Sequence, residues 1–106
     1  MYNVDKVREL NDAARQTLTG CRVMVTHGVA ALNCVDAVLA AVCSYSTFTA
    51  DNDPHGEHDF GSFTVAGERL FWKFDYYDTE MQMASLDPSD DTITVRVLTI
   101  MLAEEY

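Results

Sequence analysis

The chain has 106 residues, of which 48% are hydrophobic and 10% aromatic, with 17 acidic residues and 7 basic ones. This composition supplies enough apolar side chains for one hydrophobic core and excludes disordered and fibrous proteins. No apolar run approaches the roughly 18 residues of a transmembrane helix, and the first residues are too charged for a signal peptide. We therefore predict one domain over residues 1–106, located in the cytoplasm and without membrane contact.

The net charge of -10 belongs almost entirely to the second half of the chain. Acidic and basic residues cancel up to Ala50, whereas acids dominate from Asp51 onward. Direct binding to nucleic acid is excluded, because phosphate neutralisation needs clustered Lys and Arg. The charge favours a basic or nucleic-acid-binding protein as partner. The simpler alternative is that the acids only keep the surface hydrated.

The N-terminal residues predict a helix followed by a strand. Asn3 can cap a helix over residues 4–18, in which apolar residues recur at steps of three and four, and Gly20 can end it. Arg22 to His27 alternates between apolar and polar side chains and is rich in β-branched residues, which is typical of a half-buried strand. Gly28 is expected to close this strand.

A second helix is predicted from a cap at Asn33 to about Tyr45. The segment is almost free of charge, so we expect it to be substantially buried. Cys34 and Cys43 fall within this helix, and Cys21 lies before it. Three cysteines without paired spacing predict reduced thiols and no disulfide framework.

The middle of the chain predicts a β-hairpin and a third strand. Phe60 to Val65 and Glu68 to Tyr77 flank an Ala-Gly turn, which places Gly61 opposite Trp72. Thr79 to Ala84 alternates again and predicts a third strand of an antiparallel meander.

The last segment, Thr92 to Ile100, fits two structures. Its β-branched alternation is typical of a strand, whereas the acidic stretch Asp87 to Asp91 before it resembles the first turn of a helix. We predict the helix. The expected fold is a single α+β domain: a small antiparallel sheet, formed by the hairpin or meander and one earlier strand, packed by two N-terminal helices and one C-terminal helix.

The loop after the second predicted helix concentrates residues that can do chemistry. Calcium-loop spacing fails there because no bidentate glutamate closes the shell, and the two histidines lack the helical zinc arrangement. No nucleophile signature is present. The sequence therefore assigns no catalytic residue, metal or cofactor, and structural capping is the alternative. The candidates are Asp51, Asp53, His55, Glu57, His58 and Asp59.

A second acidic stretch, from Asp75 to Asp91, contains no Lys or Arg and is interleaved with tyrosines and methionines. Such a surface can imitate phosphates toward a nucleic-acid-binding protein, and Tyr and Met suit interfaces. The alternative is an aromatic core strand followed by a solvated loop. The predicted partner-binding residues are Asp75, Tyr77, Asp78, Glu80, Asp87, Asp90 and Asp91.

Three segments, Phe48 to Gly61, Phe71 to Asp78 and Asp87 to Tyr106, resemble a short bacterial family catalogued as domain of unknown function 3768. Arg22 to Leu32 is a weaker match. The resemblance implies alphaproteobacterial genomes and plasmids as the source, and no particular activity. By analogy, a plasmid or phage setting favours an acidic protein-binding inhibitor, such as an anti-CRISPR protein or a DNA mimic. The alternative function is a metal-dependent or carboxylate/histidine hydrolase that uses the Asp51 to Asp59 loop.

Overall fold

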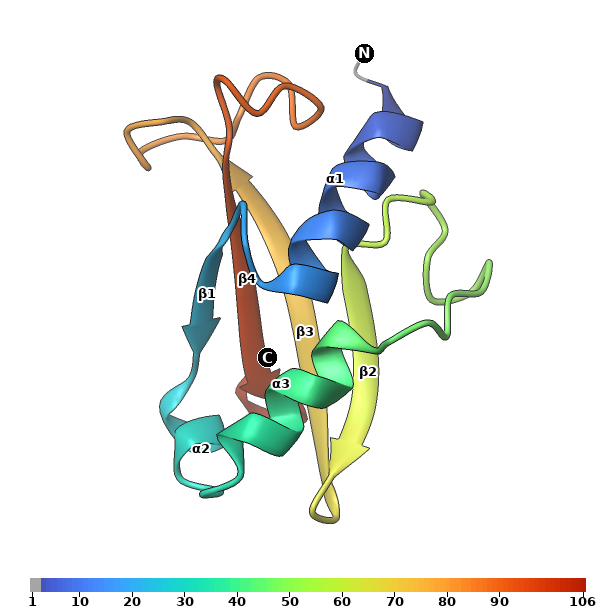
Figure 1. Cartoon of the computed structure of the whole chain (residues 1–106), viewed down its shortest axis with the longest axis vertical. Helices are drawn as coiled ribbons and strands as arrows, with labels where there is room; N and C mark the ends of the chain where they lie inside the picture. Colours follow the sequence, from blue (N-terminus) through green and yellow to red (C-terminus); the bar gives the residue numbers. More distant parts are fainter. Residues whose placement is uncertain (1–2) are drawn as a thin grey trace.

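A computed structural model describes residues 3–106 and shows one four-stranded sheet with helices packed against it (Figure 1). The α+β class is therefore confirmed. The elements, in chain order, are α1 (Val4–Thr17), β1 (Arg22–Val25), α2 (His27–Ala30), α3 (Val35–Cys43), β2 (Phe60–Val65), β3 (Glu68–Tyr77), β4 (Val95–Leu102) and the 3-10 helix η1 (Ala103–Glu105).

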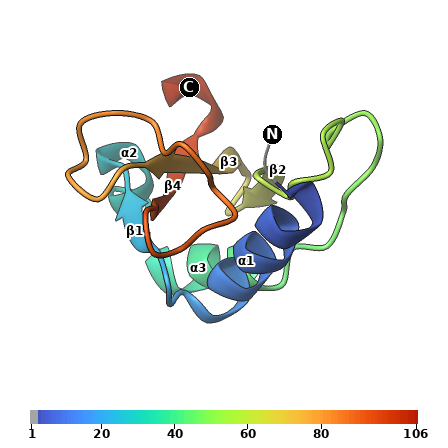
Figure 2. The ribbon, with the colours of Figure 1, turned by 90° about the horizontal axis from the view of Figure 1, so that it is seen from above.

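The strand order is β1-β4-β3-β2, with β1 parallel to β4 and the other neighbours antiparallel. The sheet is therefore mixed, which corrects the predicted antiparallel sheet. Helices α1 and α3 cover one face, as seen from above in Figure 2. The opposite face, called here the open face, carries no such helix layer in the part of the chain that the structure describes.

Helix α1 follows the sequence prediction closely. The Asn3 side chain accepts a hydrogen bond from the Lys6 amide at 3.1 Å and so caps the first turn. Leu18 adopts a left-handed conformation with φ 56° and ends the helix, and Gly20 follows with φ 71°. The cap at Asn3 is therefore confirmed, whereas the helix ends at Leu18, two residues before the predicted stop at Gly20.

The segment between β1 and α3 differs from its prediction. β1 ends at Val25, because Thr26 caps the short helix α2, which contains Gly28. Asn33 follows α2 in a left-handed conformation with φ 58°, and α3 begins only after Cys34. The predicted strand end at His27 and the predicted cap at Asn33 are therefore wrong, because an extra helical turn occupies this connection.

The predicted hairpin is confirmed, including its register. Gly61 pairs with Trp72, and Val65 pairs with Glu68. A Cβ atom on residue 61 would lie 2.6 Å from Trp72 Cε2 and 2.8 Å from Tyr45 Cζ. Glycine is required here because the indole and the tyrosine ring fill the space that any side chain would need.

The predicted C-terminal helix is wrong, because Val95–Leu102 forms the strand β4. β4 lies between β1 and β3, so both edges of its backbone are paired. The acids that resembled a helix start instead close local turns: Asp87 accepts from the Ser89 amide and Asp90 from the Thr92 amide. Pairing with two strands and β-branched composition outweigh the helical spacing.

The predicted third meander strand, Thr79 to Ala84, is also wrong. These residues form turns and bends, with a single bridge between Tyr77 and Ala84. The edge of β3 that such a strand would occupy is paired along its length with β4. An alternating sequence pattern alone could not show that this edge of β3 is already paired with β4.

The core lies between the helices and the covered face of the sheet. Its fully buried side chains come from the three α-helices and the two central strands, and Trp72 is the largest of them. The three cysteines are all free. Within residues 3–106, no helix combines the length and apolar character needed to cross a bilayer. The buried apolar residues are Val7, Ala14, Val29, Val38, Val42, Leu70, Trp72, Phe74, Leu98 and Ile100, together with Val97 and Met101, which lie on the open face of β4.

Candidate functional site

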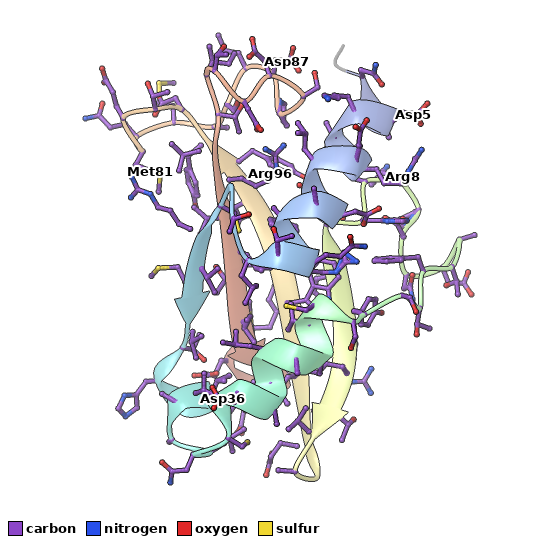
Figure 3. The ribbon with its side chains drawn as sticks, viewed as in Figure 1. Asp5, Arg8, Asp36, Met81, Asp87 and Arg96 are labelled. Carbon is purple, nitrogen blue, oxygen red and sulfur yellow. The ribbon has the colours of Figure 1, made fainter. Side chains whose placement is uncertain are left out.

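The Asp51 to Asp59 loop folds back against α1 and is held by side chains of that helix. Arg8 donates to the Gly56 carbonyl at 3.0 Å, and the Asn11 amide donates to the Glu57 carbonyl at 3.0 Å. Figure 3 shows Arg8 directed from α1 toward this loop. Side chains of the helix therefore hold the backbone of the loop. The shape of the loop depends on residues that lie 46 to 48 positions earlier in the chain.

His58 is enclosed by two carboxylates and an aromatic ring. Its Nδ1 lies 2.8 Å from Asp12 Oδ1, and its Nε2 lies 3.5 Å from Asp53 Oδ2. The Phe48 ring stacks on the imidazole with a centroid separation of 3.6 Å. The His58 backbone amide also donates to Asp53 Oδ1 at 3.1 Å. This arrangement positions the imidazole firmly and places a protein carboxylate near each ring nitrogen.

Glu57 belongs to a buried polar network that joins the loop to α1 and the sheet. Tyr76 donates its hydroxyl to Glu57 Oε1 at 2.9 Å, and Asn11 donates to the same hydroxyl at 2.8 Å. Asn11 in turn accepts from Arg96 Nε at 2.7 Å. Burial is the main cause of the raised pKa of Tyr76, so its hydroxyl stays protonated as a donor.

Asp59 is the loop carboxylate whose acidity is clearly changed. Burial, and next the neighbouring Glu57, raise the pKa of Asp59 above its ordinary range. Asp51 and His55, by contrast, are exposed. Among residues 3–106, no three His, Cys, Asp or Glu side chains are grouped so that they could hold a metal ion.

The second acidic region is the β3–β4 loop, residues 78–94, which contains five acids and no base. Asp78, Asp87 and Asp90 each accept a backbone amide within the loop, at distances of 2.9 to 3.0 Å. Thr92 hydrogen bonds lower the pKa of the exposed Asp90 carboxyl. These bonds use one oxygen of each carboxylate and shape the loop without neutralising its charge.

Two of the predicted partner-binding acids pair with cations. Asp75 lies 2.7 Å from Lys73 on the open face of β3, and Asp91 pairs with the buried Arg96. The remaining two residues of that prediction, Tyr77 and Glu80, are half-buried and exposed, respectively. Four loop acids therefore have no Lys or Arg partner among residues 3–106. They are Asp78, Glu80, Asp87 and Asp90, called here the acidic tetrad.

Apolar side chains accompany the acidic tetrad at the surface. Leu86 is 94% exposed and Met83 is 71% exposed, the two highest values among the large apolar side chains of the loop. Figure 3 places Asp87 and Met81 in this loop, at the end of the molecule where α1 begins. Apolar side chains that are exposed beside unpaired acids are a feature of contact surfaces.

The loop is nevertheless ordered. Ser85, near the middle of the loop, and Thr94, at its C-terminal end, have hydroxyls 2.7 Å apart, and Thr94 also donates to the Asp87 carbonyl at 2.9 Å. Arg96 donates to the Pro88 carbonyl and so fixes the loop to the sheet beneath it. Binding through such a loop costs less conformational entropy than binding through a disordered one.

Residues 25–105 match the family described as "Protein of unknown function (DUF3768)". The chain belongs to this family. No curated protein and no solved structure matches the chain. The resemblance found in the sequence is thereby confirmed at the level of the family.

Both acidic loops lie inside the matched range, whereas Asn11 and Asp12, which hold the first loop, precede it. Sequence reasoning named the loop residues as candidates but did not name Asn11, Asp12 and Arg96. No local pattern could identify them, because Arg96 and Asn11 are 85 positions apart. Leu86 was also missed. An isolated leucine within a polar, turn-rich stretch is a usable signal once that stretch is recognised as a loop.

Proposed function

We propose that this chain is a small acidic protein-binding module whose β3–β4 loop contacts a basic partner. The observation that carries this proposal is the acidic tetrad, whose members have no cationic partner among residues 3–106, next to the exposed Leu86 and Met83. Charge attracts and orients a basic surface, and the two apolar side chains supply area that is removed from water on contact.

The finer features of the proposal follow from charge and from the family. A protein that binds nucleic acid carries a basic surface, which a preformed acidic loop can occupy in place of phosphates. The chain would then act as an inhibitor of host nucleic-acid-binding machinery, as an anti-CRISPR protein or DNA mimic does. We place this activity in the bacterial cytoplasm, in the setting of a mobile genetic element.

The test is capture of partners from a host lysate by two variants with the same change of net charge. One variant neutralises the acidic tetrad through Asp78→Asn, Glu80→Gln, Asp87→Asn and Asp90→Asn, which keeps an acceptor oxygen at each position. The matched control neutralises four exposed acids elsewhere through Glu9→Gln, Asp36→Asn, Glu68→Gln and Glu104→Gln.

We expect the wild type and the control to enrich the same basic, nucleic-acid-binding protein, and the tetrad variant to lose it. High salt should release that protein, because salt screens the charges at the rim of an interface. Leu86→Ala should weaken capture without any change of charge. Equal capture by the tetrad variant and the control, or capture that is insensitive to salt, would refute the proposal.

Hydrolysis by the Asp51 to Asp59 loop is a second candidate, favoured by one observation. The pKa of Asp59 is raised by burial and by Glu57, which is the property of a carboxylic general acid. The purified protein should then hydrolyse members of a panel of simple carboxylate and phosphate esters, with or without added divalent metal. A folded Glu57→Gln variant should lose that activity; a variant as active as the wild type would count against hydrolysis by this loop.

A further inference from the structure

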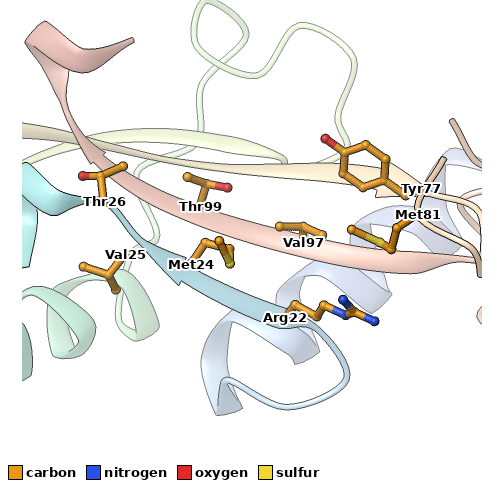
Figure 4. Close-up of a pocket in the computed structure, with 8 residues that line it drawn as sticks. All are labelled: Arg22, Met24, Val25, Thr26, Tyr77, Met81, Val97 and Thr99. Carbon is orange, nitrogen blue, oxygen red and sulfur yellow. The ribbon is translucent and has the colours of Figure 1, made fainter. Parts of the chain in front are cut away.

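The open face of the sheet contains a groove between β1 and the first part of the β3–β4 loop. Its volume is about 510 Å³, and small-molecule sites have about 300 to 1,000 Å³. Met24 of β1, Val97 of β4 and Met81 of the loop supply a mainly apolar lining (Figure 4). Met24 is 56% exposed, so part of this lining faces solvent.

Arg22 lies at one end of the groove and differs from the other Lys and Arg residues of the chain in its lack of a side-chain partner among the described residues. It is exposed, and its guanidinium makes no hydrogen bond or ion pair with residues 3–106. The six other bases each have a protein acceptor within that range. Their partners are Glu9 for Lys6, Asp5 for Arg8, Asp12 for Arg15, Ser62 for Arg69, Asp75 for Lys73 and Asp91 for Arg96.

An arginine whose guanidinium has no protein acceptor is unexpected in a chain with a net charge of -10. Seventeen carboxylate side chains are available, and the guanidinium fork is the side chain best suited to a carboxylate or phosphate. The Tyr77 and Thr99 hydroxyls, which also line the groove, make no side-chain hydrogen bond within residues 3–106. The groove therefore combines an apolar lining with one cation and two hydroxyl groups that are available to a ligand.

We propose that this groove binds a small organic carboxylate with an apolar body. The carboxylate would pair with the Arg22 guanidinium, and the apolar body would lie along Met24, Val97 and Met81. Methionine side chains are flexible and polarizable, so they can adapt to bodies of different shape. The chain's negative charge repels such an anion only weakly beyond about 8 Å at physiological ionic strength, whereas the ion pair forms at contact.

Octanoate is the probe, with 1-octanol as the matched compound that lacks the carboxylate. Each is titrated into isotopically labelled protein and followed by two-dimensional amide NMR, with no protein partner present. We expect saturable shift changes confined to β1, β4 and the residues around Met81, with octanoate binding at least about tenfold more tightly than 1-octanol, as expected for one charge-assisted bond pair.

Two groove variants and one control assign the effect to residues. Arg22→Gln should weaken octanoate binding about tenfold and leave 1-octanol unchanged. Met24→Glu should abolish octanoate binding, because it places a like charge in the lining. Arg69→Gln removes an arginine from the same open face outside the groove and should bind octanoate as the wild type does. Thermal unfolding of each variant confirms that it is folded.

Equal binding of octanoate and 1-octanol, wild-type binding by a folded Arg22→Gln variant, or shift changes spread over other surfaces would each overturn the proposal. Absence of binding by octanoate would do the same. The inference goes beyond the protein-binding function and does not rest on it. No partner takes part in the titration, so its failure leaves the role of the acidic tetrad untouched.

Discussion

The Asp51 to Asp59 loop and the β3–β4 loop have similar acidic compositions but opposite surroundings. In the first loop, Glu57 accepts a hydrogen bond from Tyr76 of β3, and His58 lies against Asp12 of α1. In the second, the acidic tetrad bonds only neutral groups within the loop or none, and Leu86 is almost fully exposed. Composition alone therefore does not indicate which acidic stretch is available to a partner.

The difference has a physical cause in what lies beside each loop. Arg8, Asn11 and Asp12 of helix α1 contact the first loop. The polar groups of that loop therefore exchange hydrogen bonds with water for hydrogen bonds with protein. Among residues 3–106, Arg96 is the one Lys or Arg that pairs with an acid of the second loop, and it is used by Asp91 and the Pro88 carbonyl. The first loop contributes to the stability of the fold, and the second presents charge to the outside.

The largest expected effect comes from removing the centre of the buried network. Asn11→Ala deletes hydrogen bonds to Glu57, Tyr76 and Arg96 and leaves the buried guanidinium with one acceptor fewer. We expect the free energy of unfolding to fall by about 3 kcal/mol, because buried polar groups lose their partners. Urea unfolding monitored by tryptophan fluorescence measures it. Asn52→Ala, at an exposed position, serves as the comparison and should lower the free energy of unfolding by about 1 kcal/mol or less. Equal losses from the two variants would contradict the conclusion that the first loop is part of the folded body.

Gly61→Ala should come next. The added methyl group would overlap the Trp72 indole and the Tyr45 ring, which must shift. We expect a loss of about 2 kcal/mol in the free energy of unfolding, within the usual range for overpacking. Gly67→Ala in the hairpin turn meets no atom within 4 Å and tests backbone strain alone. If Gly61→Ala were as stable as the wild type, the packing between the hairpin and the segment around Tyr45 would be looser than described.

The pH dependence of stability should have opposite signs in the two loops. Asp59 has a raised pKa in the folded state, so its ionisation opposes folding at pH values above the ordinary aspartate range of about 4. Asp59→Asn should therefore raise stability near neutral pH, and this gain should vanish below that range, where Asp59 is protonated in both states. Thermal unfolding of the wild type and the Asp59→Asn variant at a series of pH values measures the gain near neutral pH and its loss in acid.

Asp90 has a lowered pKa, so its charged form favours folding. That contribution is present above the ordinary aspartate range and is lost as the pH falls through the folded-state pKa. Asp90→Asn should therefore lower stability slightly near neutral pH, and this difference should fade in acid. A gain of stability from Asp90→Asn near neutral pH would contradict the description of the second loop.

Neutralising the whole acidic tetrad should have the smallest effect on the fold. Each Asn or Gln keeps an acceptor for the local turn, and no ion pair with residues 3–106 is lost. We expect the free energy of unfolding to change by less than about 1 kcal/mol, as for most surface substitutions. Chemical denaturation beside the Glu9, Asp36, Glu68 and Glu104 control measures it. A large loss would show that the tetrad stabilises the fold after all.

Part of the candidate site was predictable from the sequence, because acidic composition and turn residues are local properties. Asp78, Glu80, Asp87 and Asp90 were selected in this way as candidates. The contact of His58 with Asp12 and the hydrogen bond from Arg96 to Asn11 join residues that are 46 and 85 positions apart in the chain. No spacing rule relates these residues, because only the folded chain brings them together.

Local sequence patterns are sufficient to predict helix α1 with its cap at Asn3, the β2–β3 hairpin with Gly61 opposite Trp72, and the acidic character of the second half. Each depends on neighbours a few positions apart. Tertiary structure decided that Val95–Leu102 is a strand, because pairing with β1 and β3 satisfies both edges of its backbone. It also decided which acidic loop faces inward, because α1 supplies partners to one loop and leaves the other to solvent.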